Sequence, residues 1–218
     1  MRTAVVCGGP PDLPFLSDYF EKNEIDVTIA ADRGYNYLTE IGRRPDILLG
    51  DYDSVEKGAG GIAFSGGKMY TYPAEKDFSD SEAALNVAMN LMKERGELGR
   101  LDFLCATGGR LDHFLANIGL LNTALRAGID ARILDAKNEI RLIDRSISLR
   151  REEIGGRYVS IIPYTERVEN VTLRGFHYPL EGAAVTREGT LTISNLCEAE
   201  EAEIRFGRGI LILILSED

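Results

Sequence analysis

The first part of the chain alternates short apolar segments with amphipathic ones, and this alternation constrains the fold more than any other feature. Apolar segments typical of buried strands occupy residues 3–7, 26–31, 46–50, 100–106 and 131–136. Segments with helical spacing of apolar side chains occupy residues 13–23, 35–42, 79–96 and 111–128. Repeated βα units with nearly continuous apolar strands are typical of a parallel sheet covered by helices. The sequence therefore predicts an α/β domain with a mostly parallel, Rossmann-like sheet.

The segment at residues 79–96 carries the clearest helix signals. Ser79 with Glu82 forms a capping box, in which two side chains satisfy free N–H groups at the start of the helix. Gly96 is a typical C-terminal cap, because glycine adopts the left-handed conformation without strain. We expect a helix bounded by these residues.

The pattern changes near residue 137. The segments that follow are short, rich in β-branched residues and separated by Gly, Pro or Asn, at residues 139–144, 146–152, 157–164, 170–175, 189–195 and 202–215. Several alternate apolar and polar side chains, which is typical of antiparallel strands with one face in water. No comparable helix is expected there. The sequence therefore predicts an α/β domain at residues 1–137 and an all-β, sandwich-like domain at residues 138–218.

The charge balance narrows the possible partners. The chain has 25 Lys and Arg against 35 Asp and Glu, a net charge of −10. Nucleic acids and anionic membranes attract basic surfaces, so neither is expected as a main partner. A small anionic ligand stays possible, because it needs only a local positive group or a metal ion.

Cysteine usage and the apolar runs indicate the compartment. Three separated cysteines without a Cys-x-x-Cys pair, and only two histidines, argue against a zinc site. The N-terminal residues lack the long apolar segment of a signal peptide, and the run at 210–215 is too short to span a bilayer as a helix. We expect a cytoplasmic protein.

Acidic side chains cluster where predicted strands end, and ligands of open α/β sheets bind at those ends. Asp51 and Asp53 point to one face if the backbone there is extended. They are either solvated turn residues or ligands of Mg²⁺, which prefers carboxylate oxygens. Asp77 and Asp80 flank the start of the capped helix, where Asp80 is also explained by the helix dipole alone.

A glycine-rich turn precedes the helix predicted at 111–128. Gly108 and Gly109 let the backbone approach a ligand closely, and Arg110 can grip phosphate oxygens with its planar guanidinium. The N–H groups of the following helix favour an anion at the same place. Taken alone, a tight loop without a ligand is the more common explanation of such glycines. His113 suits a ligand contact, helix packing or catalysis.

Four motifs together resemble the thiamine pyrophosphokinase family. They are "AADRGYNYL", "PDILLGDYDS", "PAEKDFSDSEAAL" and "TGGRLDHFLANIGLL", in the order and approximate spacing of that family. The segments "SIIPYTERVENVTLRGFHYPLEG", "LTISN" and "FGRGILIL" are similar to its thiamine-binding β domain. The resemblance covers nearly the whole chain.

The resemblance implies an activity and a set of site residues. The family transfers the pyrophosphoryl group of ATP to the hydroxyl of thiamine, which gives thiamine diphosphate and AMP. By matching motif, the ligands of Mg²⁺ would be Asp51, Asp53 and Asp80. Residues around the nucleotide would be Asp32, Asn36, Lys76, Gly108, Gly109, Arg110 and Asp112, and residues near thiamine would be Ser194 and Asn195. The family also implies a homodimer with thiamine at the subunit interface.

Several positions depart from the family's pattern. Arg33 stands in "DRG", where the family usually has Asp-Gly-Gly, and Tyr52 replaces a more common phenylalanine. Ser79 replaces threonine, and Leu196 stands where an acid is frequent. The chain has no Trp, so an aromatic side chain stacked on thiamine would be Tyr, Phe or His.

Some roles stay open at the level of sequence. Asp77 or Asp112 would be either the general base or a supporting residue behind the site. Lys76 would either contact phosphate or form a salt bridge with a neighbouring acid. Rival functions are a pyrophosphokinase for another hydroxymethyl compound such as a pterin, a non-catalytic thiamine binder, and a nucleotide-binding structural protein.

Overall fold

The computed structural model describes residues 1–50, 67–73 and 75–218. The chain forms two compact units, Met1–Ala136 and Lys137–Asp218. Each unit is described separately below. No helix among the described residues is both long and apolar enough to cross a membrane.

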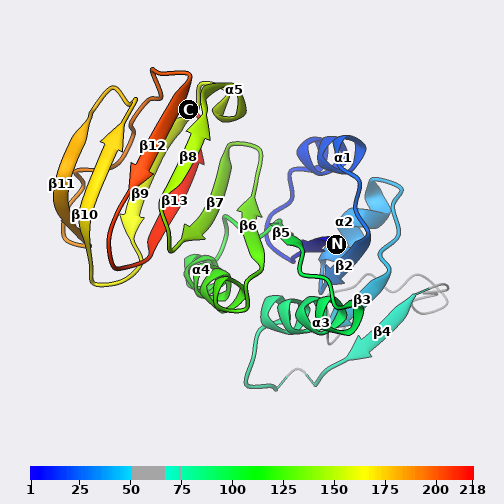
Figure 1. Cartoon of the computed structure of the whole chain (residues 1–218). Coiled ribbons are helices and arrows are strands. Elements are labelled where there is room, and N and C mark those ends of the chain that lie inside the picture. The colour runs from blue at the N-terminus through cyan, green and yellow to red at the C-terminus, as the bar shows by residue number, and fades with distance from the viewer. Residues whose placement is uncertain (51–66, 74) are drawn as a thin grey trace. The chain divides into compact units, whose positions relative to one another are not determined.

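The first unit is a six-stranded parallel sheet with helices on both faces (Figure 1). Its elements in chain order are β1 (Arg2–Val6), α1 (Leu13–Lys22), β2 (Val27–Ala31), α2 (Gly34–Glu40), β3 (Ile47–Gly50), β4 (Lys68–Thr71), α3 (Asp80–Arg95), β5 (Arg100–Leu104), α4 (Leu111–Arg126) and β6 (Asp130–Leu134). The strand order is β4-β3-β2-β1-β5-β6, and every pair is parallel. The predicted parallel sheet is confirmed, although β4 was not predicted.

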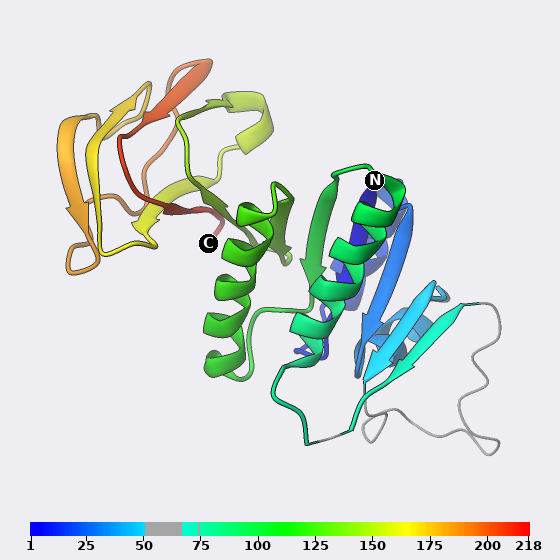
Figure 2. The same cartoon turned by 60° about the horizontal axis from the view of Figure 1, so that its bottom comes forward.

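The order of the strands creates a switch point between β1 and β5. From β1 the chain adds β2, β3 and β4 on one side, and it then returns to add β5 and β6 on the other. The helices that follow β1 and β5 consequently lie on opposite faces, with α1 and α2 on one face and α3 and α4 on the other (Figure 2). A switch point of this kind leaves a crevice at the carboxyl ends of the two central strands.

Helix α3 begins and ends as the sequence predicts. The backbone N–H of Glu82 donates to Oγ of Ser79 at 3.2 Å, which is the N-terminal half of the capping box. Gly96 closes the helix in the left-handed conformation with φ of 65°. These caps fix the first turn of α3, with Asp80, at the carboxyl edge of the sheet.

A buried ionic cluster ties three strands and α1 together at Asp102, whose side chain is fully buried. Its carboxylate accepts hydrogen bonds from Arg2, Arg100 and Arg132 on neighbouring strand positions. The hydroxyl of Tyr19 on α1 donates to the same carboxylate at 2.7 Å. A buried carboxylate is tolerated when it is paired and hydrogen-bonded in this way.

The second unit is a β sandwich. Its elements are β7 (Asn138–Ile143), β8 (Ile147–Arg150), α5 (Arg151–Ile154), β9 (Tyr158–Pro163), β10 (Arg167–Arg174), β11 (Leu180–Thr186), β12 (Glu201–Arg205) and β13 (Leu211–Ser216). The strands β7-β13-β9 form one antiparallel layer, and β11-β10-β12-β8 form the other. Alternate apolar side chains from both layers make a single core that includes Val159, Val171 and Leu213. This arrangement agrees with the predicted sandwich-like domain.

One predicted strand of this unit is wrong. Residues 189–195 form turns and bends rather than a strand, with an isolated bridge between Val159 and Asn195. The strand in this region is β11, Leu180–Thr186, which was not predicted. Ser194 has φ of 55°, a left-handed conformation that a regular strand does not contain. Local β propensity is therefore overridden by the contacts of Asn195, which are described below.

Candidate functional site

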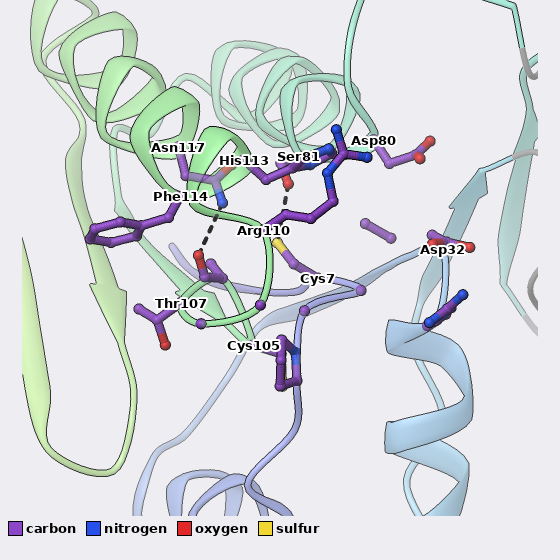
Figure 3. A pocket seen from close by; sticks show the side chains of 18 of the residues that line it. Cys7, Asp32, Asp80, Ser81, Cys105, Thr107, Arg110, His113, Phe114 and Asn117 are labelled. Carbon is purple, nitrogen blue, oxygen red and sulfur yellow. Dashed lines mark hydrogen bonds between the residues drawn. The ribbon is translucent and has the colours of Figure 1, made fainter.

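A cavity of about 440 Å³ lies at the switch point of the first unit (Figure 3). It is lined by residues 7–10 after β1, residues 31–33 after β2 and residues 105–110 after β5. The first turns of α3 and α4 complete it, with Ser81 and His113 among the lining side chains. The crevice expected from the strand order is thus a real cavity, bordered by two helix N-termini.

The backbone after β1 and the backbone after β5 approach each other closely. The N–H of Gly9 donates to the carbonyl oxygen of Cys105 at 3.0 Å. A Cβ atom on Gly9 would lie only 2.4 Å from that oxygen, so only glycine fits. The same holds for Gly34 at the start of α2, where a Cβ atom would lie 2.0 Å from the carbonyl oxygen of Val6. Because Gly9 and Gly34 have no side chain, the segments around the cavity can pack closely against one another.

The loop after β5 ends in two left-handed glycines. Gly108 and Gly109 have φ of 74° and 61°, which side-chain-bearing residues adopt only with strain. The loop leads directly into α4, and the first turn of this helix lines the cavity with His113 and Phe114. Asn117 secures this geometry from within α4, because its buried Nδ2 donates to the carbonyl oxygen of Ala106 at 3.1 Å. Such a helix start favours an anion.

Two of the predicted acidic residues, Asp32 and Asp80, line the cavity (Figure 3). Asp32 adopts a left-handed conformation with φ of 52° at the end of β2. Asp80 is the first residue of α3. Its carboxylate accepts a hydrogen bond from the ammonium of Lys76 at 2.7 Å. The side chain of Lys76 is nearly buried between the rings of Tyr72 and Phe78. Of the two roles open for Lys76, the salt bridge is the one observed.

Arg110 is paired with Asp112 in this structure. Its Nε and Nη2 atoms donate to the two carboxylate oxygens of Asp112 at 3.2 and 2.6 Å. The hydrogen bonds from Arg110, with one from the backbone N–H of His113, lower the pKa of Asp112 to about 2. A carboxylate with so low a pKa accepts protons weakly, which makes Asp112 a poor general base in this arrangement.

Two thiols at the cavity were not singled out as site residues by the sequence. Cys7 and Cys105 follow β1 and β5, and the hydroxyl of Ser81 donates to Sγ of Cys7 at 3.5 Å. Burial raises the pKa of Cys7 to about 11 and that of Cys105 to about 12. Both thiols are therefore protonated at neutral pH and serve as lining groups rather than nucleophiles. Their apolar sequence context indicated burial but not the cavity.

The described lining of the cavity does not include every predicted residue of the first unit. Asp77 is exposed, and Asp77 and Asn36 are not among the residues that line the cavity. Asp51 and Asp53 lie outside the described residues. Within the described ranges, no group of three or more His, Cys, Asp or Glu side chains could hold a metal ion. The magnesium site expected at Asp51, Asp53 and Asp80 stays a prediction.

The two predicted thiamine residues belong to the second unit. Ser194 is exposed, whereas Asn195 is only 4% exposed. The Oδ1 atom of Asn195 accepts the backbone N–H groups of Tyr178 and Leu196 at 2.9 and 3.0 Å. Its Nδ2 atom donates to the carbonyl oxygen of Tyr178 at 2.8 Å. Asn195 therefore joins two loops, and Ser194, Leu196 and Tyr178 are exposed side chains beside it.

Comparisons with known proteins agree with this architecture. The family model "Thiamin pyrophosphokinase, catalytic domain" matches residues 20–133, and the model "Thiamin pyrophosphokinase, vitamin B1 binding domain" matches residues 145–211. The thiamine pyrophosphokinase of Bacillus subtilis is 34% identical over 216 residues, which cover 98% of each chain. The chain belongs to the thiamine pyrophosphokinase family. The family and the enzymatic activity inferred from the four motifs are thereby confirmed.

Solved structures show the same fold over the whole chain. The crystal structure of the thiamine pyrophosphokinase from Bacillus subtilis has a TM-score of 0.83 at 31% identity, and each chain is covered completely. The thiamin pyrophosphokinase from Geobacillus thermodenitrificans also has a TM-score of 0.83, at 33% identity, with 100% of this chain and 98% of the other covered. The predicted fold class is confirmed. Nothing in these comparisons supports the pterin-specific, non-catalytic or structural alternatives.

The close approach at Gly9 can be tested by substitution. Gly9→Ala places a Cβ atom against the carbonyl of Cys105, so we expect the free energy of unfolding to fall by about 1–3 kcal/mol. ATP affinity should fall as well, because the loop must move. Gly119→Ala in α4 is the matched control, since its Cβ atom meets nothing within 4 Å. Urea denaturation and ATP titration would measure both effects. Equal stability and affinity in the two variants would contradict the account.

Proposed function

We propose that the cavity of the first unit is the site where ATP donates its pyrophosphoryl group to the hydroxyl of thiamine. One observation carries this proposal: two helix N-termini, a glycine loop and an aspartate converge on a single cavity at the switch point. Helix N-termini and glycine loops suit phosphates, and the first unit is then the catalytic, ATP-binding domain. The matches to the catalytic family model over residues 20–133 support the same assignment.

The charges at the cavity suit a polyphosphate. Arg110 can donate two parallel N–H groups to phosphate oxygens once its hydrogen bonds to the carboxylate of Asp112 are broken. Gly108 and Gly109 leave room for those oxygens near the backbone. Asp32 would face the nucleoside end of the ligand, as its motif in the family implies. The ammonium of Lys76 pairs with the carboxylate of Asp80 and would balance the negative charge of that carboxylate.

Of the three predicted Mg²⁺ ligands, Asp80 is the one that the structure describes. Its carboxylate borders the cavity and already accepts a cationic group, the ammonium of Lys76. Asp80, together with Asp51 and Asp53, would hold Mg²⁺, for which carboxylate oxygens are suitable ligands. When bound, Mg²⁺ supplies charge neutralisation and orientation of the phosphate oxygens.

The reaction requires one bond to form and one to break. The hydroxyl oxygen of thiamine forms a bond to the β-phosphorus of ATP. The bond between the β-phosphorus and the α,β-bridging oxygen breaks, and AMP leaves with the bonding electrons. The proton of the hydroxyl passes to a base. Positioning and charge stabilisation supply most of the catalysis in such transfers, and these are the tasks of the helix N-termini and Arg110.

The second unit is the proposed thiamine-binding domain. The vitamin B1 binding model matches residues 145–211, which include Ser194 and Asn195. Because the side-chain atoms of Asn195 are engaged with Tyr178 and Leu196, we assign Asn195 to holding this surface in shape. Ser194 and the ring of Tyr178, which is 62% exposed, are then the groups that face thiamine. Tyr178 would also supply the aromatic surface that a chain without Trp needs.

We further propose that the enzyme is a homodimer with thiamine at the interface. Leu111 and Leu115 lie one turn apart on α4 and are 70% and 65% exposed. Tyr178, Leu191 and Ile193 are exposed on the second unit. Exposed apolar side chains on both units suit an interface in which each surface meets a second copy of the chain. The cytoplasmic location expected from the sequence also stays a prediction.

The dimer is tested by the mass of the protein in solution. We expect light scattering to give twice the mass of one chain. Leu115→Asp should yield the monomer and raise the KM for thiamine, because a charge would be buried in the interface. Leu98→Asp, at another exposed leucine of the first unit, is the matched control and should remain dimeric. A monomeric unmodified protein with full activity would refute this part of the proposal.

The activity itself is tested by AMP formation from ATP and Mg²⁺ with each candidate acceptor. We expect AMP and thiamine diphosphate to appear in equal amounts when thiamine is added. AMP formed with a hydroxymethyl pterin but not with thiamine would overturn the substrate. Tight thiamine binding without release of AMP would indicate a non-catalytic binder.

The proposed metal ligands Asp51 and Asp53, which lie outside the described residues, are tested by substitution. Asp51→Asn and Asp53→Asn should each lower turnover by about 100-fold, because each removes a carboxylate that neutralises the metal–phosphate complex. The Mg²⁺ concentration for half-maximal rate should rise, while the free energy of unfolding should not change. Asp18→Asn on the surface of α1 is the control and should behave as the unmodified enzyme. Normal turnover of either variant at saturating Mg²⁺ would remove that residue from the metal site.

A further inference from the structure

Among the residues that the structure describes, three cationic side chains lie in or beside the cavity, and they differ in their partners. Lys76 is paired with Asp80, and Arg110 is paired with Asp112. Arg33 lines the cavity and is exposed, yet its side chain forms no hydrogen bond or ion pair with any residue that the structure describes. Within the described part of the chain, the guanidinium of Arg33 can therefore bind a ligand without giving up an ion pair.

The backbone around Arg33 directs it to the cavity. Asp32, in the left-handed conformation, turns the chain at the end of β2, and Arg33 is the N-cap of α2. The segment lies against the loop after β1, because a Cβ atom on Gly8 would be 3.5 Å from the nitrogen and 3.7 Å from the Cβ of Arg33. Glycine at position 8 leaves this side of the cavity open.

Arg33 and Arg110 lie in the connections that follow the two strands on either side of β1, which are β2 and β5. Arg33 follows β2, and Arg110 follows β5, while the loop at Gly8 and Gly9 follows β1 between them. A ligand seated over that loop lies between the two arginines. Guanidinium groups on two sides suit a polyphosphate, whose oxygens are distributed along its length.

The charge at the cavity favours the same use of Arg33. Asp32 and Asp80 line it with two negative charges, and the phosphates of a nucleotide add several more. Arg110 must first exchange Asp112 for phosphate, whereas Arg33 has no such competitor among the described residues. An exposed arginine that lines this cavity, and that has no ion-pair partner among the described residues, suits an anionic ligand.

We propose that Arg33 is a nucleotide-binding residue of this chain that contacts phosphate oxygens of ATP from the β2 side of the cavity. The inference rests on the proposed function, since it takes ATP as the ligand of the cavity. It gives a role to a residue that departs from the family's usual glycine. The arginine at this position makes the cavity of this chain more strongly anion-binding than glycine would.

The test compares ATP affinity among four forms of the full chain. Calorimetry with ATP and Mg²⁺, in the absence of thiamine, would be run on the unmodified protein, Arg33→Ala, Arg33→Lys and Arg44→Ala. Arg44 is an exposed arginine of the same unit that does not line the cavity, which makes it the matched control. We expect Arg33→Ala to weaken ATP binding about tenfold, as loss of one charged hydrogen bond does. Arg33→Lys should recover part of this affinity.

Two further measurements separate phosphate binding from a structural role. The affinity for adenosine, which has no phosphate, should be unchanged in Arg33→Ala, as should the free energy of unfolding. In turnover, the KM for ATP should rise while the KM for thiamine stays the same.

The possible failures are distinguishable. ATP affinity of Arg33→Ala equal to that of Arg44→Ala would overturn the inference, and thiamine-dependent AMP formation would then leave the proposed function intact. An equal loss of adenosine and ATP affinity would also overturn it, because the contact would not be to phosphate. Failure of the unmodified protein to bind ATP would refute the proposed function as well.

Discussion

The contact between the backbones that follow β1 and β5 is the constraint on which the site depends. The hydrogen bond from the N–H of Gly9 to the carbonyl of Cys105, at 3.0 Å, joins two of the loops that line the cavity at the switch point. It requires glycine at position 9, since any Cβ atom would overlap the carbonyl oxygen. With the two loops held together, the glycines at 108 and 109 and the N-terminus of α4 come to one side of the cavity, and Asp32 and Asp80 come to the other.

The electrostatic arrangement reconciles an acidic protein with an anionic substrate. The net charge of −10 does not determine the potential in the cavity. The groups that line it include helix N-termini and arginines as well as acids. The acids at the cavity are partly paired within the protein, as Asp80 is with Lys76. Such pairs hold the carboxylates in place, and binding of the proposed metal and phosphates would replace the paired cation.

Local patterns in the sequence were sufficient to predict much of the fold. The capping residues Ser79 and Gly96 define α3 because their effect acts within one helical turn. Continuous apolar runs predicted the parallel strands, since burial on both faces leaves no alternation. The segment at 189–195 was mistaken for a strand because its conformation depends on hydrogen bonds between Asn195 and Tyr178, a loop residue 17 positions away.

The site was predictable only in outline for the same reason. The positions of Asp32, Asp80 and Arg110 at the ends of strands and starts of helices follow from the order of elements. The pairing of Lys76 with Asp80 was one of two options, and the participation of Cys7, Ser81 and Asn117 carried no local signal. These contacts join segments far apart in the chain, and only the folded strand order brings them together.

The most direct test of the account is a crystal structure with thiamine and an ATP analogue whose α,β-bridging oxygen is replaced by a methylene group. The account predicts phosphates between the loop at Gly8 and Gly9 and the loop at Gly108 to Arg110, with the β-phosphate toward Asp80. Thiamine should lie beside Ser194 with its hydroxyl directed at that phosphate. A nucleotide bound outside this cavity, or thiamine far from Ser194, would contradict it.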